Sequence, residues 1–231
     1  MSRRGDIAGE VLGEPLGGVP YNPPPMLLDD HLRALITERL SRGADKEAVD
    51  RRIWAEYGEQ WCVMATDLSG FSRGVAEFGI IHFLQTIFES ERLLIPVLER
   101  HGGTLLKIEG DSFFVIFEDP KNAIRASIEM QRAVRRYNVD RLPEERVLLG
   151  VGLGFGPMLR VGQEDVFGNE VNSACILGET HAGSYDILVT QAVRELAGDG
   201  LVFEEFPHAP PGAGKAYRLV YSSSIDALTG D

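Results

Sequence analysis

The sequence predicts an α+β domain, in which helices pack on one face of a single sheet, with a helical extension in front of it. Between residues 61 and 221, short apolar runs typical of strands alternate with longer segments of helical periodicity. They follow the order strand, long helix, hairpin, helix, strand. This order is typical of ferredoxin-like palms.

The chain before residue 61 divides into a tail and a helical extension. Residues 1–26 are expected to form a flexible tail, because the prolines and glycines of residues 15–25 cannot continue a helix or a strand. Residues 27–60 read as two helices, the first capped by Asp29 and the second running from Asp45 to Tyr57. The first has its apolar residues at three- and four-residue spacing, namely Leu32, Leu35, Ile36 and Leu40. Their simplest role is to pack against the domain or to contact a regulatory partner.

Residues 61–221 form the predicted domain, and the spacing of their apolar residues gives its elements. Strands are expected at 61–66, 103–108, 112–117, 147–153, 187–190, 201–203 and 217–221. Helices are expected at 75–100, 120–137, 169–178 and 191–196, with a mobile loop at 162–168. Residues 222–231 are expected to be a C-terminal tail.

The charge balance bears on what the protein binds. The chain has 35 acidic and 23 basic residues and a net charge of −12, so it repels a phosphate backbone and nucleic acid is not an expected partner. An acidic protein still binds a polyphosphate where metal ions supply positive charge, which makes pairs of carboxylates of interest. The chain contains neither a secretory signal nor a run of 18 apolar residues, so the sequence predicts no membrane span and a cytoplasmic location.

Two aspartates stand where strands end. Asp67 follows the first strand, and Asp111 lies in the tight turn between two later strands. Sheet order in a palm places that turn beside the first strand, so the two carboxylates are expected to converge. Each also has a purely structural interpretation, Asp67 as a helix cap and Asp111 as a turn residue.

Three segments resemble, in order and spacing, the signature segments of class III adenylate and guanylate cyclases. They are Asp67-Leu68-Ser69-Gly70-Phe71-Ser72, Lys107-Ile108-Glu109-Gly110-Asp111, and the stretch from Asp165 to Ala174. The resemblance covers about 160 residues and implies the nucleotidyl cyclase type of palm. It also implies conversion of ATP to 3′,5′-cyclic AMP and pyrophosphate for intracellular signalling, with two divalent cations, Mg²⁺ or Mn²⁺, at a homodimer interface.

The resemblance assigns roles residue by residue. Asp67 and Asp111 match the metal-binding aspartates, which suits the hard oxygen ligands that these cations need. Lys107 and Asp165 match the pair that reads the purine. Adenine offers an acceptor at N1 and a donor at its 6-amino group, so an ammonium and a carboxylate complement it and favour ATP. Asn172 matches the residue that positions the ribose.

Three further residues are candidates for substrate binding. Gly70 and Phe71 lie in the turn after Asp67, where backbone N–H groups and a helix N-terminus can cradle phosphate oxygens. Lys215 lies where the family often supplies a late lysine to the triphosphate. The glycines at 150, 152, 154 and 156 do not have dinucleotide-binding spacing; at period two on a strand they leave one face flat, where a ligand or a backbone can approach.

One position departs from the family pattern. Four residues after Asn172, where the family usually has an arginine that stabilises charge in the transition state, this chain has Ile176. Losing one preorganised donor costs on the order of 10²–10³ in rate. Arg73, Arg160 and Lys215 are possible substitutes. The sequence leaves two functions open, a slow adenylate cyclase and a cyclase-like module that binds nucleotide or metal without turnover.

Overall fold

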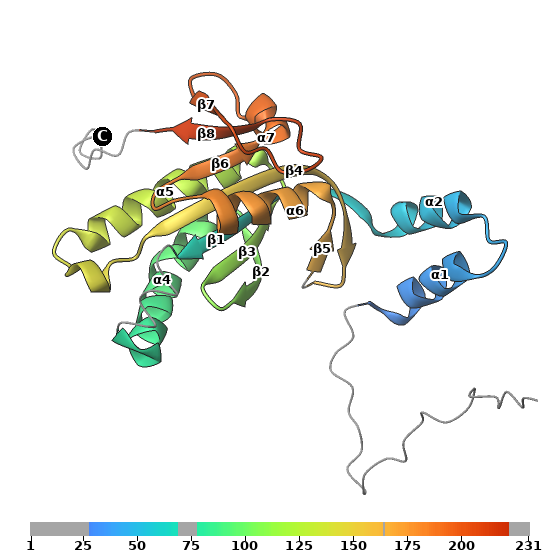
Figure 1. Cartoon of the computed structure of the whole chain (residues 1–231), viewed down its shortest axis with the longest axis horizontal. Helices are drawn as coiled ribbons and strands as arrows, with labels where there is room; N and C mark the ends of the chain where they lie inside the picture. Colours follow the sequence, from blue (N-terminus) through green and yellow to red (C-terminus); the bar gives the residue numbers. More distant parts are fainter. Residues whose placement is uncertain (1–27, 69–77, 164, 222–231) are drawn as a thin grey trace, which may run out of the picture.

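The computed structural model describes residues 28–68, 78–163 and 165–221. Within them, eight strands form one sheet, in the order β2-β3-β1-β4-β6-β8-β7 with β5 paired to β4 (Figure 1). The strands are β1 (Gly58–Leu68), β2 (Thr104–Glu109), β3 (Ser112–Phe117), β4 (Leu149–Val161), β5 (Asp165–Phe167), β6 (Ile187–Thr190), β7 (Val202–Phe206) and β8 (Ala216–Val220). The helices are α1 (Asp30–Leu40), α2 (Lys46–Tyr57), α4 (Ile80–Arg100), α5 (Pro120–Asn138), η1 (Pro143–Glu145), α6 (Asn169–Cys175), η2 (Ile176–His181) and α7 (Gln191–Leu196). The predicted α+β class is confirmed.

The central strand β1 is apolar on both faces, and both faces of the sheet are covered. Cys62 and Met64 join the larger core, to which α4, α5 and α7 contribute. Val63 and Ala65 point to the opposite side and pack with residues of α6. The prediction that helices pack on one face only is therefore wrong in part, because α4, α5 and α7 cover one face and α6 covers the other. A strand buried on both faces has no polar alternation, and this fits the continuous apolar run of β1.

Helix α6 lies unusually close to the sheet because glycines leave room for it. A Cβ atom at Gly152 of β4 would lie 2.2 Å from the carbonyl oxygen of Ala174, and one at Gly178 would lie 2.4 Å from that of Ala65. The flat face expected from the period-two glycines is thus occupied by the α6–η2 backbone (Figure 1). Any larger side chain at these two positions would push α6 away from the sheet.

A half-buried carboxylate fixes the start of α6. Glu170 accepts a hydrogen bond from the backbone N–H of Phe155 at 3.0 Å and one from the hydroxyl of Thr190 at 2.7 Å. Burial raises the pKa of Glu170, and the two hydrogen bonds oppose that rise. Together with the glycine contacts, they determine where the residues of α6 project.

The two N-terminal helices pack against the domain. Asp29 caps α1, as the sequence predicts, by accepting a backbone N–H bond of 2.8 Å, and Asp45 caps α2 in the same way at 3.0 Å. Their shared apolar residues form a cluster with Leu159 and Val161 of β4. Leu40, in contrast, is 78% exposed and lies outside this cluster.

Several predicted boundaries differ from the structure. Strand β1 begins at Gly58, directly after α2, because the β4 strand extends to Val161 and pairs with all eleven residues of β1. The predicted mobile loop at 162–168 is wrong for its second half, since Asp165–Phe167 form β5 and pair with β4. The predicted start of the long helix at residue 75 and both predicted tails lie outside the described residues. Among the described helices, none is long and apolar enough to cross a membrane.

Candidate functional site

The turn between β2 and β3 lies beside the end of β1, as the palm topology predicts. Strands β1 and β3 pair antiparallel, with Ala65 opposite Phe114. The hydroxyl of Thr66 accepts a 3.0 Å hydrogen bond from the N–H of Phe113, which ties the two strands together next to the aspartates. Asp67 and Asp111 therefore come from neighbouring chain segments, and the charge of Asp111 contributes to the environment of Asp67.

The electrostatics of these aspartates fit a cation site. Burial raises the pKa of Asp67 to about 6, and the nearby charges of Asp111 and Glu179 add to the rise. Burial also raises the pKa of Asp111, although backbone amides of Asp111 and Leu68 oppose it. The Oδ2 atom of Asp111 is buried and has no hydrogen-bond partner in the described part of the chain. A divalent cation between the carboxylates would relieve both the repulsion and the unpaired oxygen.

The protein itself supplies few ligands for such a cation. Among the described residues, no group of three acidic, histidine or cysteine side chains is placed to hold a metal ion. Magnesium characteristically keeps several waters and takes one or two carboxylates together with substrate phosphates. Asp67 and Asp111 fit that mode of binding, in which the remaining ligands come from a nucleotide and from water.

The raised pKa of Asp67 predicts a pH-dependent stability difference. Between about pH 4 and 6 the folded protein binds more protons at Asp67 than the unfolded chain does, so the free energy of unfolding falls as pH rises through this window. Without metal, Asp67→Asn should raise the melting temperature by a few degrees at pH 7.5 and have almost no effect at pH 3.5. Calorimetric scans in EDTA measure this, and an equal effect at both pH values would contradict the assigned environment.

The structure brings the two predicted purine-reading residues together. Lys107 Nζ lies 2.9 Å from Asp165 Oδ1 and 3.0 Å from Glu109 Oε1. Both contacts raise the pKa of Lys107, and the hydrogen bond to Asp165 has the larger effect. The ammonium also lies over the Phe114 ring, 5.7 Å from its centroid. Lys107 belongs to β2 and Asp165 to β5, so strands far apart in the sequence build the pair.

This pair retains hydrogen-bonding capacity for a ligand. A lysine ammonium has three donors, and two of them face Asp165 and Glu109. A carboxylate accepts at two oxygens, and only Oδ1 of Asp165 meets the lysine. One donor and one acceptor therefore remain side by side, the combination that the Watson–Crick edge of adenine complements.

Asn172 and Ile176 lie on one face of the helical segment, because four residues make about one turn. Asn172 is exposed and Ile176 is half-buried. Ile176 is the first residue of η2, a π-helical turn that continues α6 to His181. The missing arginine is therefore a local change of side chain on an intact helix, and no shift of register brings another residue into its place.

The other candidates divide into two groups. Gly70, Phe71 and Arg73 lie outside the described residues. Lys215 is exposed, and its ammonium lies 2.7 Å from Glu205 at the β7–β8 edge of the sheet. Strands β4 and β6 separate that edge from β1, so within one chain Lys215 is not beside the aspartates.

Arg160 is also engaged elsewhere. It pairs with Glu59 at 3.4 Å and lies over the Trp61 ring, 5.1 Å from its centroid. A substitute for the arginine missing at 176 would have to leave these partners.

Two acidic residues near the site were not predicted from the sequence. Glu109 lies two residues from Lys107 on β2, a spacing that predicts a shared face. The charge of Glu179 raises the pKa of Asp67. The predicted helix ends at Gly178, one residue before Glu179, so the sequence did not place this carboxylate. No sequence signal marks the π-helical turn that carries Glu179 toward the aspartates.

Comparison with known proteins adds a distant sequence relative and clear structural ones. No protein-family model matches the chain. A stretch of 151 residues is 28% identical to putative adenylate cyclase 3 of Rhizobium meliloti (strain 1021), covering 65% of this chain and 24% of that protein. The chain thus spans about a quarter of the length of this relative.

Two solved structures share the fold. The guanylyl cyclase Cya2 superposes with a TM-score of 0.62 at 20% identity, covering 70% of this chain and 92% of its own. The dimeric guanylyl cyclase domain of a RhoGC fusion protein from the aquatic fungus Blastocladiella emersonii gives 0.60 at 15% identity, covering 70% and 96%.

The sheet order and these similarities define the class of the domain. It has the fold of the class III nucleotidyl cyclase catalytic domain. The related sequence stretch agrees with the resemblance of the three sequence segments to that family, and this resemblance is confirmed at the level of the fold.

Proposed function

We propose that this chain is an adenylate cyclase of low turnover, which converts ATP to 3′,5′-cyclic AMP and pyrophosphate at a homodimer interface. The observation that carries the proposal is the pair Lys107–Asp165, held at 2.9 Å with one donor and one acceptor unused. The half-buried aspartates Asp67 and Asp111 support it, because they suit two divalent cations.

Each residue has a defined task in this proposal. Asp67 and Asp111 hold the cations, which when bound lower the pKa of the ribose 3′-hydroxyl and neutralise charge on the triphosphate. Lys107 donates to adenine N1, and Asp165 accepts from the 6-amino group. Asn172 orients the ribose so that the 3′-oxygen lies in line with the α-phosphorus. Ile176 offers no donor to the phosphoryl oxygens, which accounts for low turnover.

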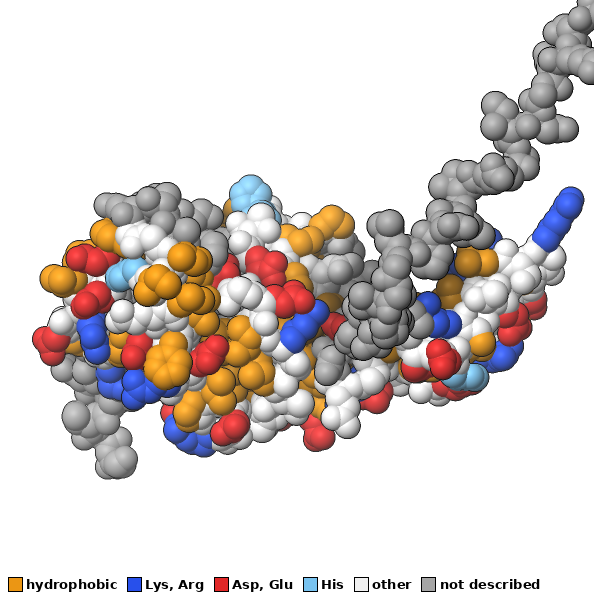
Figure 2. Space-filling view, turned by 90° about the horizontal axis from the view of Figure 1, so that it is seen from below, with side chains coloured by type: hydrophobic (Ala, Val, Ile, Leu, Met, Phe, Trp, Pro, Cys, Tyr) orange, Lys and Arg blue, Asp and Glu red, His pale blue; other side chains and the backbone are white. Residues whose placement is uncertain are grey.

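An exposed apolar helix face supports the homodimer. Ile80, Ile81, Leu84 and Phe88 of α4 are all more than half exposed, with 76% exposure at Ile81. Figure 2 shows apolar side chains gathered in the left half of the view, the half that holds α4. Contiguous apolar surface on a folded domain is characteristic of an interface. In the proposed dimer, the aspartates of one protomer face Lys107, Asp165 and Asn172 of its partner.

The direct test is an assay of cyclic nucleotide formation with Mn²⁺ and each of ATP, GTP, CTP and UTP. Cyclic AMP should be the main product, formed at a rate that Asp140→Asn, a change of an exposed loop aspartate, leaves unaltered. Turnover of none of the four nucleotides, with ATP binding retained, would favour the alternative function, a nucleotide-binding regulatory module. The observation that favours this alternative is Ile176 itself.

Exchange of the purine-reading pair should change the preferred nucleotide. Lys107→Glu with Asp165→Cys presents an acceptor and a weak, neutral group, which suit the donors on the guanine edge. The ratio of kcat/KM for GTP over ATP should rise by about 10²-fold, because unpaired polar groups in a partly buried site penalise the wrong base. Rates measured for both nucleotides test this, and an unchanged ratio would show that the base binds elsewhere.

A further inference from the structure

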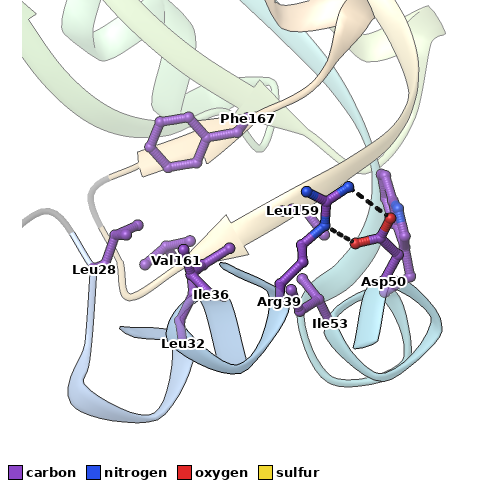
Figure 3. Close-up of a pocket in the computed structure, with 10 residues that line it drawn as sticks. Leu28, Leu32, Ile36, Arg39, Asp50, Ile53, Leu159, Val161 and Phe167 are labelled. Atoms are coloured by element: carbon purple, nitrogen blue, oxygen red, sulfur yellow. Dashed lines mark hydrogen bonds and ion pairs between the residues drawn. The ribbon is translucent and has the colours of Figure 1, made fainter. Parts of the chain in front are cut away.

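A cavity of about 400 Å³ lies between the N-terminal helices and the β4–β5 ribbon (Figure 3). Its walls come from α1, α2, β4 and β5 and from Leu28, two residues before α1. They are mostly apolar, and comprise Leu28, Leu32, Ile36, Ile53, Trp54, Leu159, Val161, Phe167 and the pair Arg39–Asp50. The volume falls within the range of about 300–1,000 Å³ that is typical of small-molecule sites.

The cavity is open to solvent along two aromatic side chains. Phe167 is 37% exposed and Trp54 is 45% exposed, although both are large and line the same hollow. Exposed aromatic surface in a concave site favours an apolar ligand body, because burying it removes apolar area from water.

One polar group in the cavity has an unused donor. Arg39 donates from Nε to Asp50 Oδ1 at 2.5 Å and from Nη2 to Asp50 Oδ2 at 3.1 Å. Its third nitrogen, Nη1, has no polar partner in the described part of the chain. In Figure 3 this nitrogen points away from Asp50 and toward the cavity. Because Asp50 already neutralises Arg39 and the protein is acidic overall, a neutral acceptor fits this position better than a second carboxylate.

We propose that the cavity binds a neutral amphiphile, with a short acyl chain as its apolar body and a carbonyl oxygen as its head. The acyl chain packs against the apolar walls, and the carbonyl oxygen accepts a hydrogen bond from Nη1 of Arg39.

The same ribbon that forms one wall of the cavity carries the purine-reading aspartate. Antiparallel pairing sets Leu159 opposite Phe167 and Val161 opposite Asp165. Asp165 and Phe167 are two residues apart on β5 and therefore share a face. A ligand that packs against Phe167 and Val161 therefore contacts the strand that carries Asp165, the partner of Lys107. The cavity is thus a regulatory site, at which the bound amphiphile changes the affinity of the chain for nucleotide. This role rests on the proposed function.

The binding test uses the full chain with Trp61→Phe, which leaves Trp54, a cavity residue, as the sole tryptophan. Octanamide should change Trp54 fluorescence saturably and bind about 10-fold more tightly than octanoate or octylammonium. Ile36→Asn should weaken octanamide binding about 10-fold, and Leu40→Asn, a matched change of an exposed leucine on the same helix, should not. Arg39→Met should remove the preference among the three head groups.

Three results would overturn the site. The first is the absence of saturable octanamide binding. The second is equal octanamide binding by the Ile36→Asn and Leu40→Asn variants when both melt like wild type, and the third is octanamide binding that occurs only after residues 1–26 are removed. The last would mean that the chain's own N-terminal segment fills the cavity.

Regulation is tested separately, by titrating Mn²⁺–ATP with and without saturating octanamide. We expect the nucleotide dissociation constant to change about fivefold, a typical coupling between two sites. An unchanged constant would overturn the regulatory role. The absence of any nucleotide binding would contradict the proposed function and leave the amphiphile site standing, because Trp54 reports that site without nucleotide.

Discussion

Replacing either Asp67 or Asp111 by asparagine should abolish Mn²⁺-dependent nucleotide binding and reduce cyclase activity at least about 10³-fold. Asparagine keeps the size of the side chain but removes the negative charge that holds a divalent cation. The effect should be large for each residue alone, because both carboxylates lie in one half-buried site. There, water compensates little for a lost contact between a carboxylate and the cation.

Calorimetric titration with Mn²⁺–ATP measures this loss, and thermal melting confirms that the variants fold. Asp140→Asn makes the same chemical change at an exposed loop position and serves as the matched control. If Asp111→Asn binds Mn²⁺–ATP as the control does, then Asp111 is a turn residue and not a metal ligand.

Replacing Ile176 by arginine should increase turnover by about 10²-fold. Residue 176 lies one helical turn beyond Asn172 on the same face, so in the proposed site an arginine there would project toward the phosphates, beside the amide that we propose positions the ribose. One preorganised donor at a developing negative charge accounts for about 10²–10³ in rate. The gain should appear in kcat with little change in KM, because the added contact forms in the transition state.

Ile176→Met is the control for the length of the new side chain, and it should leave kcat unchanged, since it adds no donor. A half-buried isoleucine contributes to packing, so the comparison requires variants with similar melting temperatures. An arginine variant that folds normally and turns over no faster would show that low activity has another cause.

Much of the arrangement follows from local patterns in the sequence. Asp29 and Asp45 begin helices because a short acidic side chain caps the free N–H groups of a first turn. The neighbouring positions of Asp67 and Asp111 follow from a hairpin that must pair with β1. The face shared by Asn172 and Ile176 follows from helical periodicity alone.

Other features depend on contacts that no local pattern reveals. Asp165 was expected in a mobile loop, because Gly162 and Gly168 flank a short polar segment. Pairing with an extended β4 turns that segment into a strand and sets Asp165 against Lys107. The π-helical turn that carries Glu179, whose charge raises the pKa of Asp67, lies against β1 at Gly178, where only a glycine fits. Both are consequences of tertiary packing.

The most direct test of a shared catalytic site is to mix two inactive variants, Asp67→Ala and Asn172→Ala. In a two-fold dimer with composite sites, both lesions of a mixed dimer fall in the same pocket, and the other pocket is intact. If subunits exchange at random, half of all dimers are mixed and each has one working site, so cyclic AMP formation should recover to about a quarter of the wild-type rate. A mixture that stays inactive, with subunit exchange verified and the wild type active, would contradict the shared site.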